Sequence, residues 1–141
     1  MIDSDTYFNL QQFYAKQMQS LDGGDADAFA ASFTTDGVFV HYPHDEVHGR
    51  DAIQAATRKG VERTRSLGIV RRHWFGMLEV TAGPDHTICT RYSAITSAVN
   101  ASGEVRLEPT CMVEDVLVVN PDGGYLNHSR TVRRDDLKVA Q

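Results

Sequence analysis

Residues 71–80 read RRHWFGMLEV, a run of aromatic and β-branched side chains that is typical of a long β-strand. Side chains alternate across a strand, so we expect His73, Phe75 and Met77 to share one face. The opposite face would then carry Trp74, Leu78 and Val80. A histidine that leads an apolar face is either a hydrogen-bonded core residue or a proton-exchanging group at the mouth of a pocket. This stretch alone leaves both roles open for His73.

Helical patterns precede this strand, and further strand patterns follow it. Apolar residues at three- and four-residue spacing predict three helices, at residues 4–21, 26–33 and 50–64. Short strands are expected between the second and third helices, at 38–42 and 46–48. Long strand-like runs separated by Gly, Pro, Asn and Asp follow at 69–81, 87–99, 106–119 and 125–132.

This order of elements predicts one α+β domain over residues 1–141. We expect a cone in which three N-terminal helices pack on a curved antiparallel or mixed sheet and enclose an apolar pocket. Gly60 weakens the third helix by about 1 kcal/mol relative to alanine, which suggests a close packing contact there.

Composition limits the classes of partner. The net charge of −5 argues against nucleic acid, and no apolar run is long enough to cross a membrane. The N-terminus lacks a signal-peptide pattern, so we expect a cytoplasmic protein. Cys89 and Cys111 have no zinc-type spacing and are interpreted as free thiols.

A cluster of histidines could in principle form a metal site. His41, His44 and His48 flank Asp45 and Glu46, all of which are possible ligands. They do not have helical spacing and lie across a strand end and a loop, so we interpret the segment as a solvated lip over the pocket. The chain also has no Gly-rich phosphate loop. We therefore expect no metal and no cofactor.

Several motifs resemble the SnoaL-like and scytalone-dehydratase-like group of the nuclear-transport-factor-like superfamily. These are FYA at 13–15, LDGGDADAF at 21–29, FTTDGVF at 33–39, GRDAI at 49–53 and RH at 72–73. The resemblance covers nearly the whole chain. The segment RHWFGM at 72–77 is similar to small cyclase or dehydratase proteins of bacterial aromatic-polyketide pathways. The resemblance thus implies a role in secondary metabolism, such as antibiotic biosynthesis.

The resemblance to scytalone dehydratase implies site residues at three matching positions. Its acidic residue falls on Asp22, its third-strand histidine on His73 and a pocket tyrosine on Tyr42. The chain departs from that pattern elsewhere, at Leu21, Arg91, Met112 and Glu114. These departures argue that the chain does not share the substrate or the water-positioning network of scytalone dehydratase.

The implied chemistry is general acid–base catalysis. Asp22 would fix the tautomer of His73, whose other nitrogen would remove a proton α to a carbonyl and return it to a departing hydroxyl. Tyr42 either polarises the carbonyl or only packs. Arg91 either contacts an anionic or enolate-forming substrate or pairs with Glu114. The apolar wall is expected from Phe33, Phe75, Met77 and Met112, which could equally be ordinary core.

We therefore expect a cofactor-independent dehydratase, cyclase or isomerase that acts on a small aromatic or polyketide-like ketone. Two alternatives remain open. One is a non-catalytic ligand-binding or assembly module, like the small subunit of ring-hydroxylating dioxygenases, and the other is a cofactor-free oxygenase. A homodimer is expected because the long strands are apolar on both faces, and helices can cover only one of them.

Overall fold

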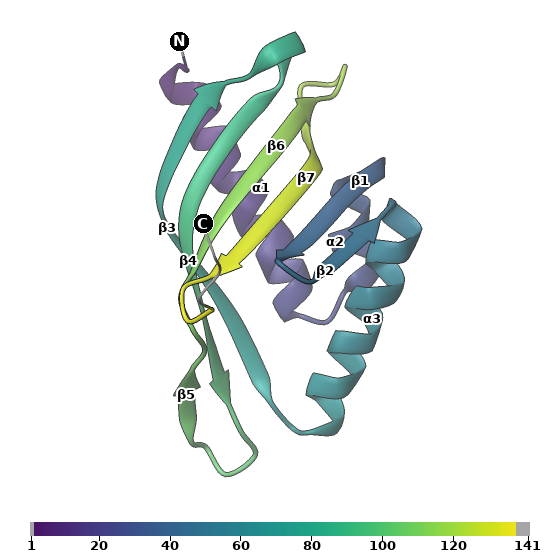
Figure 1. Cartoon of the computed structure of the whole chain (residues 1–141), viewed down its shortest axis with the longest axis vertical. Coiled ribbons are helices and arrows are strands. Elements are labelled where there is room, and N and C mark those ends of the chain that lie inside the picture. The colour runs from purple at the N-terminus through teal and green to yellow at the C-terminus, as the bar shows by residue number, and fades with distance from the viewer. Residues whose placement is uncertain (1, 138–141) are drawn as a thin grey trace.

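The computed structural model describes residues 2–137 and shows helices that cover one face of a curved sheet (Figure 1). The helices are α1 (Ser4–Asp22), α2 (Ala26–Ala31) and α3 (Arg50–Ser66). The strands are β1 (Phe33–Tyr42), β2 (Asp45–His48), β3 (Val70–Ala82), β4 (Ile88–Val99), β5 (Val105–Leu107), β6 (Cys111–Val119) and β7 (Tyr125–Arg134), with a 3-10 turn, η1 (Pro84–His86), before β4. The expected α+β class is confirmed. The expected grouping of three helices at the N-terminus is not confirmed: α1 and α2 precede the sheet, whereas α3 follows β1 and β2, the two strands expected at 38–42 and 46–48.

The ends of α1 are encoded locally. The Asp3 side chain accepts a hydrogen bond from the backbone N–H of Thr6 at 2.8 Å, which satisfies one free donor of the first turn. At the other end Gly24 has a φ of +84°, a conformation that favours glycine and stops the helix. The helix therefore ends with Asp22 in a fixed position, directly before the turn.

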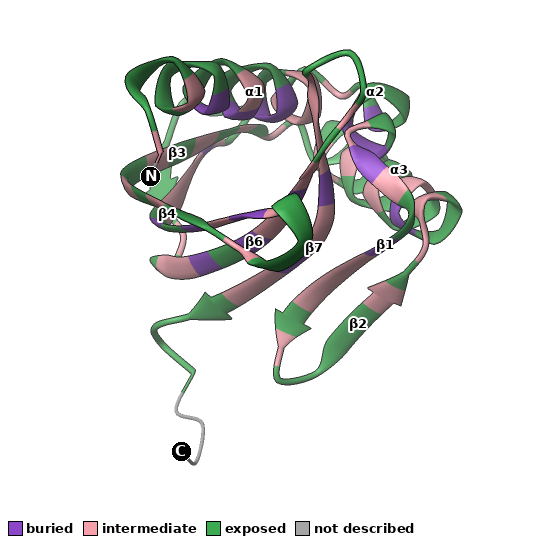
Figure 2. Cartoon of the chain, turned by 90° about the horizontal axis from the view of Figure 1, so that it is seen from above, coloured by how far each residue is buried: buried purple, intermediate pink, exposed green. Residues whose placement is uncertain are grey.

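The sheet is mixed and has the order β2-β1-β7-β6-β4-β3, with β5 paired to β4 beyond this path. Strands β1 and β7 pair in parallel, whereas the other pairs are antiparallel. Seen from above, the sheet bends around a central space that α1 closes on one side, with α2 and α3 next to β1 (Figure 2). This curvature gives the chain a concave inner face and a convex outer face.

A β-bulge in β3 overturns the simple alternation expected for residues 71–80. Gly76 pairs with Ser93 and Glu79 with Arg91, so β3 has one more residue than β4 in this interval. Met77 takes up the extra residue with a φ of +55° and is 90% exposed. Leu78 is thereby moved to the inner face, where it packs with the core. The expected position of Met77 beside His73 and Phe75 is wrong for this reason.

Three other expected boundaries also differ. The single run predicted over 106–119 is divided into β5 and β6, with Pro109 in the break, because proline cannot supply a ladder donor. The expected helix at 26–33 ends at Ala31, and Phe33 begins β1 instead. The strand expected at 38–42 begins earlier, because residues 33–37 also belong to β1, whose pairing with β7 is irregular between Phe33 and Val38.

Two apolar clusters fill the inside of the cone. One joins α1 to β4 and β6, around Leu10, Tyr92 and Leu117. The other joins α2, α3 and the start of β1, around Phe29, Phe33 and Ile53. The cavities described below lie next to these clusters. Within residues 2–137 no helix is both long and apolar enough to span a membrane.

Candidate active site

The end of α1 and the start of β3 meet through two hydrogen bonds. Asp22 Oδ1 lies 2.6 Å from His73 Nδ1, and Asp22 Oδ2 accepts the backbone N–H of His73 at 3.1 Å. The Asp22 side chain is only 9% exposed and that of His73 is 21% exposed. One carboxylate therefore holds both the ring and the backbone of His73, although 51 residues separate the two in sequence.

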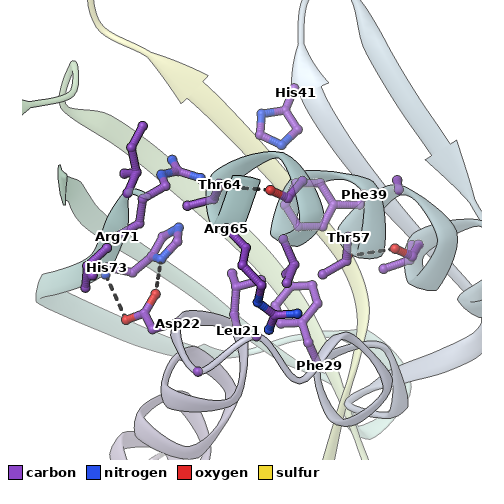
Figure 3. A pocket seen from close by; sticks show the side chains of 18 of the residues that line it. Leu21, Asp22, Phe29, Phe39, His41, Thr57, Thr64, Arg65, Arg71 and His73 are labelled. Carbon is purple, nitrogen blue, oxygen red and sulfur yellow. Dashed lines mark hydrogen bonds and ion pairs between the residues drawn. The ribbon is translucent and has the colours of Figure 1, made fainter. Parts of the chain in front are cut away.

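This contact determines which ring nitrogen is available for chemistry. An ionised carboxylate only accepts hydrogen bonds, so Nδ1 carries the proton in the neutral ring and Nε2 keeps its lone pair. Figure 3 shows the far edge of the ring pointing away from Asp22. His73 therefore lines both cavities with Nε2 free of Asp22, an arrangement that proton transfer requires.

Two adjoining cavities meet at His73. The larger is about 610 Å³ and extends over the inner faces of β3, β4, β6 and β7. The smaller is about 470 Å³ and lies between α3 and the α1–α2 turn, and it includes Asp22. Both are lined by Leu21, Phe29, Phe39, His41, Arg71 and His73. Volumes of this size suit small organic ligands.

The structure brings together only some of the predicted site residues. Phe75 lines the larger cavity beside His73. Phe33 is fully buried in the core and lines neither cavity. Tyr42 is also outside both cavities, because its ring lies 4.1 Å from the guanidinium carbon of Arg133. The expectation that Phe33 and Tyr42 face the ligand is therefore not met.

The remaining predicted residues lie on the convex face. Along β6 the inner positions are Val113, Asp115 and Leu117, which places Met112 and Glu114 on the outside. Arg91 is exposed on the outer face of β4, directly across from Glu114 in register. Glu114 also lies 3.8 Å from Arg133. Arg91 and Glu114 are thus cross-strand neighbours, but within residues 2–137 the ion pair of Glu114 is with Arg133. The outward placement of Arg91 does not agree with an inward contact with substrate.

The inward arginine is Arg130 on β7, which sequence reasoning missed. Its Nε and Nη2 each lie 2.9 Å from one oxygen of Asp115, and the exposed fractions of the two side chains are 3% and 0%. Asp115 Oδ2 also accepts hydrogen bonds from Tyr14 and Tyr92 at 2.8 and 3.0 Å. The available signal was the alternation of β6, since Asp115 occupies the apolar inner series.

Electrostatics keep this ion pair charged. Burial is the largest single influence and acts against the guanidinium charge, but Asp115, Tyr92 and Tyr14 together outweigh it, so the pKa of Arg130 is raised above its usual range. Burial and the same carboxylate raise the pKa of Tyr14, which therefore remains a neutral donor. Arg130 is thus a permanent buried cation.

Further polar groups line the mouth of the larger cavity. Arg71 donates to Glu108 at 2.6 Å, and Arg106 and Arg134 lie on the same lining. His41 stacks on Phe39, with 4.9 Å between ring centroids. His41 is exposed at the end of β1. Contact of its ring with the cavity lining withdraws part of it from water and lowers its pKa, the cations Arg130, Arg134 and Arg71 lower it further, and Asp45 opposes them. The cavity therefore combines an apolar wall with a cationic rim.

The predicted lip has no metal-like cluster among the described residues. His48 lies 2.6 Å from Glu46, whereas His41 lines the cavity. Within residues 2–137 no three His, Cys, Asp or Glu side chains come together as a metal site would require. His41 is therefore part of the pocket.

A cone of this kind, with a polar pair at the end of its first helix, places the protein in the nuclear-transport-factor-2-like fold class. An NTF2-like protein from Novosphingobium aromaticivorans shares this fold, with a TM-score of 0.79 at 19% identity, covering 99% of this chain and 94% of that chain. The model of the SnoaL-like domain matches residues 4–131. The chain belongs to the SnoaL-like family.

Solved structures from actinobacteria agree with this assignment. Aln2 from a Streptomyces species is 37% identical with a TM-score of 0.89, covering 96% of this chain and 95% of that chain. ActVI-ORFA from Streptomyces coelicolor is 34% identical with a TM-score of 0.90, covering 97% and 100%. A protein from Catenulispora acidiphila in complex with S-DNPA is 34% identical with a TM-score of 0.82, covering 95% and 96%. The comparison with curated proteins gives no match.

Proposed function

We propose that the protein is a cofactor-independent acid–base enzyme, a dehydratase, cyclase or isomerase that acts on an aromatic, polyketide-like ketone. The observation that carries this proposal is the Asp22–His73 contact, which leaves Nε2 of a cavity-lining histidine free. A ring oriented by a carboxylate is the arrangement that general bases use. The similarity to a Catenulispora acidiphila protein in complex with S-DNPA supports a small-molecule ligand.

In the proposed reaction, His73 Nε2 takes a proton from the carbon α to a ketone. The C–H electron pair forms the new C–C double bond, and the carbonyl π pair moves onto oxygen. When this enolate collapses, the β-hydroxyl leaves with the proton from His73, as water. The Asp22 carboxylate stabilises the imidazolium between the two steps. In an isomerase the same proton would return to a different carbon.

The shape and polarity of the larger cavity support a flat apolar ligand. Phe39, Phe75 and Tyr92 offer aromatic surface, while Val113 and Val132 add apolar contact. Aromatic rings gain about 0.5–1.5 kcal/mol from offset or edge contacts beyond simple burial. A ligand with fused rings and one or two oxygens would use both the wall and the polar groups.

The experiment that tests the proposal follows exchange of α-protons. A panel of 1-tetralones and β-hydroxy aryl ketones is incubated with the protein in D₂O, and ¹H NMR measures the loss of the α-proton signal. We expect at least one ketone to exchange about 10²–10⁴-fold faster with the wild type than with His73→Ala. The matched control is Arg72→Ala, which alters an exposed neighbour on β3. Binding without catalysed exchange across the panel would instead favour the non-catalytic ligand-binding module.

A further inference from the structure

In the buried Arg130–Asp115 pair, one guanidinium nitrogen of Arg130, Nη1, takes no part in the ion pair. Nε and Nη2 form one edge of the planar guanidinium, and that edge faces Asp115. Nη2 also donates to Gln17 at 2.7 Å and to Asn127 at 3.4 Å. No hydrogen bond within residues 2–137 involves Nη1, which lies at the corner of the group directed away from Asp115.

The residues around Arg130 indicate what its unpaired Nη1 can contact. Its guanidinium carbon lies 5.9 Å from the ring centroids of both Phe39 and Phe75. These two rings line the larger cavity, and so does Arg130 itself. Nη1 is not among the fully buried atoms that lack a hydrogen-bond partner within residues 2–137, so it is accessible and can meet a partner in the cavity. That partner would come from whatever occupies the cavity.

The position of Arg130 relative to His73 suits one substrate. Phe75, whose ring centroid lies 5.9 Å from the guanidinium carbon of Arg130, is the next inward residue after His73 on β3, and His73 and Arg130 both line the larger cavity. In an enolate the charged oxygen is on the carbon next to the α-carbon. A ligand that places its α-carbon at His73 can therefore extend its oxygen toward the floor.

We propose that Arg130 Nη1 binds the oxygen of the substrate that becomes an enolate, and that Arg130 is a catalytic residue of the proposed reaction. This assignment rests on the proposed function and specifies its substrates as ketones or phenols with an oxygen that becomes anionic. The cation is fixed before reaction by Asp115, Gln17 and Asn127, so no reorganisation is needed when charge develops. It takes the role that the sequence suggested for Tyr42, whose ring lies outside the cavity.

The purely structural alternative is that the network only ties α1 to β6 and β7. Replacing a buried ion pair with apolar side chains is often neutral or stabilising, so such a pair is weak evidence for stability alone. A structural network would also treat Tyr14 and Arg130 as equivalent, because both donate to Asp115. The proposal separates them, since Arg130 lines the cavity and Tyr14 does not.

The test uses 4-nitrophenol, whose neutral and ionised forms differ in absorbance, as a stable analogue of the enol and enolate. We expect the pKa of the phenol to be lower when bound to the wild type than in free solution. Arg130→Lys and Arg130→Gln should raise the bound pKa by about one unit, a tenfold change in the ionisation constant. Tyr14→Phe should leave the bound pKa within a few tenths of the wild-type value. Arg71→Gln removes a cation at the cavity mouth. It should change the pKa of the bound phenol less than the Arg130 variants do.

Each contrary result has a defined meaning. Equal effects of Arg130→Gln and Arg71→Gln would show a general positive potential rather than a contact and would overturn the assignment. Equal effects of Tyr14→Phe and Arg130→Lys would indicate a structural network only. If the Arg130 variants fail to fold, wild-type protein labelled with ¹⁵N-arginine decides the question, because the Nη signals of Arg130 should move on addition of 4-nitrophenol. Unmoved signals at saturation would also overturn it.

The same probe separates failure of this inference from failure of the proposed function. His73→Ala should abolish α-proton exchange while the bound phenol still has a lowered pKa. A lowered phenol pKa that depends on Arg130, in a wild type that exchanges no α-proton, would preserve the oxygen site and reject the enzymatic function.

Discussion

Asp22 and His73 are joined at two points, because one carboxylate binds both the ring Nδ1 and the backbone N–H of the histidine. The contact links the last residue of α1 to the fourth residue of β3. A rotation of the imidazole would break the bond to Nδ1, so the direction of Nε2 is set by the fold. Catalytic groups need this kind of support to remain in a productive orientation.

The outer face of the sheet should tolerate substitution. Arg91→Ala and Met112→Ala should each change the free energy of unfolding by less than about 0.5 kcal/mol, since these side chains lie on the convex face. Phe75→Ala should cost about 2 kcal/mol or more, because its ring packs 4.3 Å from that of Tyr92 between centroids. Urea unfolding of the three variants measures these changes in the free energy of unfolding. A loss at Arg91 as large as that at Phe75 would contradict the assigned faces.

A glycine in α3 offers a stabilising change. A Cβ added at Gly60 meets no atom within 4 Å, so the close packing contact expected from the sequence is absent. Gly60→Ala should therefore raise the free energy of unfolding by about 0.5–1 kcal/mol through helix propensity. Thermal or urea unfolding checks the sign. The control is Gly24→Ala, which should destabilise the protein because Gly24 has a φ of +84°. A destabilising Gly60→Ala would refute the account.

His41 should make stability dependent on pH. Its pKa in the folded protein lies below the value of 6.5 for an unperturbed histidine, owing to partial desolvation and nearby arginines. The unfolded chain therefore binds more protons as the pH falls through about 6.5, and acidification destabilises the fold. Urea midpoints at pH 7.5 and 5 should differ less for His41→Gln than for the wild type. His44→Gln, on an exposed turn, is the control, and identical pH dependence in all three proteins would disprove the effect.

The homodimer remains a prediction, but the structure changes which surface we expect to form its interface. The bulge moves Leu78 inward, so the middle of β3 is less apolar outside than the alternation suggested. Exposed apolar side chains lie instead on β3 and β5, both of which pair with β4; they are Val70, Trp74, Met77, Val105 and Leu107. Light scattering at micromolar concentration should give twice the chain mass, and Trp74→Lys should reduce it. A wild-type monomer under these conditions would rule out this interface.

The order of helix and strand patterns predicted the fold class. The pairing of Asp22 with His73 was implied by the resemblance to scytalone dehydratase, since 51 residues separate the two and no local motif joins them. Sequence reasoning failed at the bulge, since an extra residue at Met77 has no distinct signature and reverses the face of every later residue in β3. Arg91 and Glu114 were chosen because they match pocket positions of scytalone dehydratase, whereas the structure buries Arg130 and Asp115. Pairing of β7 with β6 decides which arginine is inside, and that pairing depends on tertiary structure.

The central claim is that Asp22 and His73 act as one unit, and a double-mutant cycle tests it most directly. Rates of α-proton exchange are measured for the wild type, Asp22→Asn, His73→Ala and the double variant. We expect His73→Ala to lose about 10²–10⁴-fold and Asp22→Asn to lose less, because the amide mis-sets the ring without removing it. The double variant should be little slower than His73→Ala, since residues that act together are not additive. Losses that multiply, or exchange that survives His73→Ala within a few-fold, would contradict the claim.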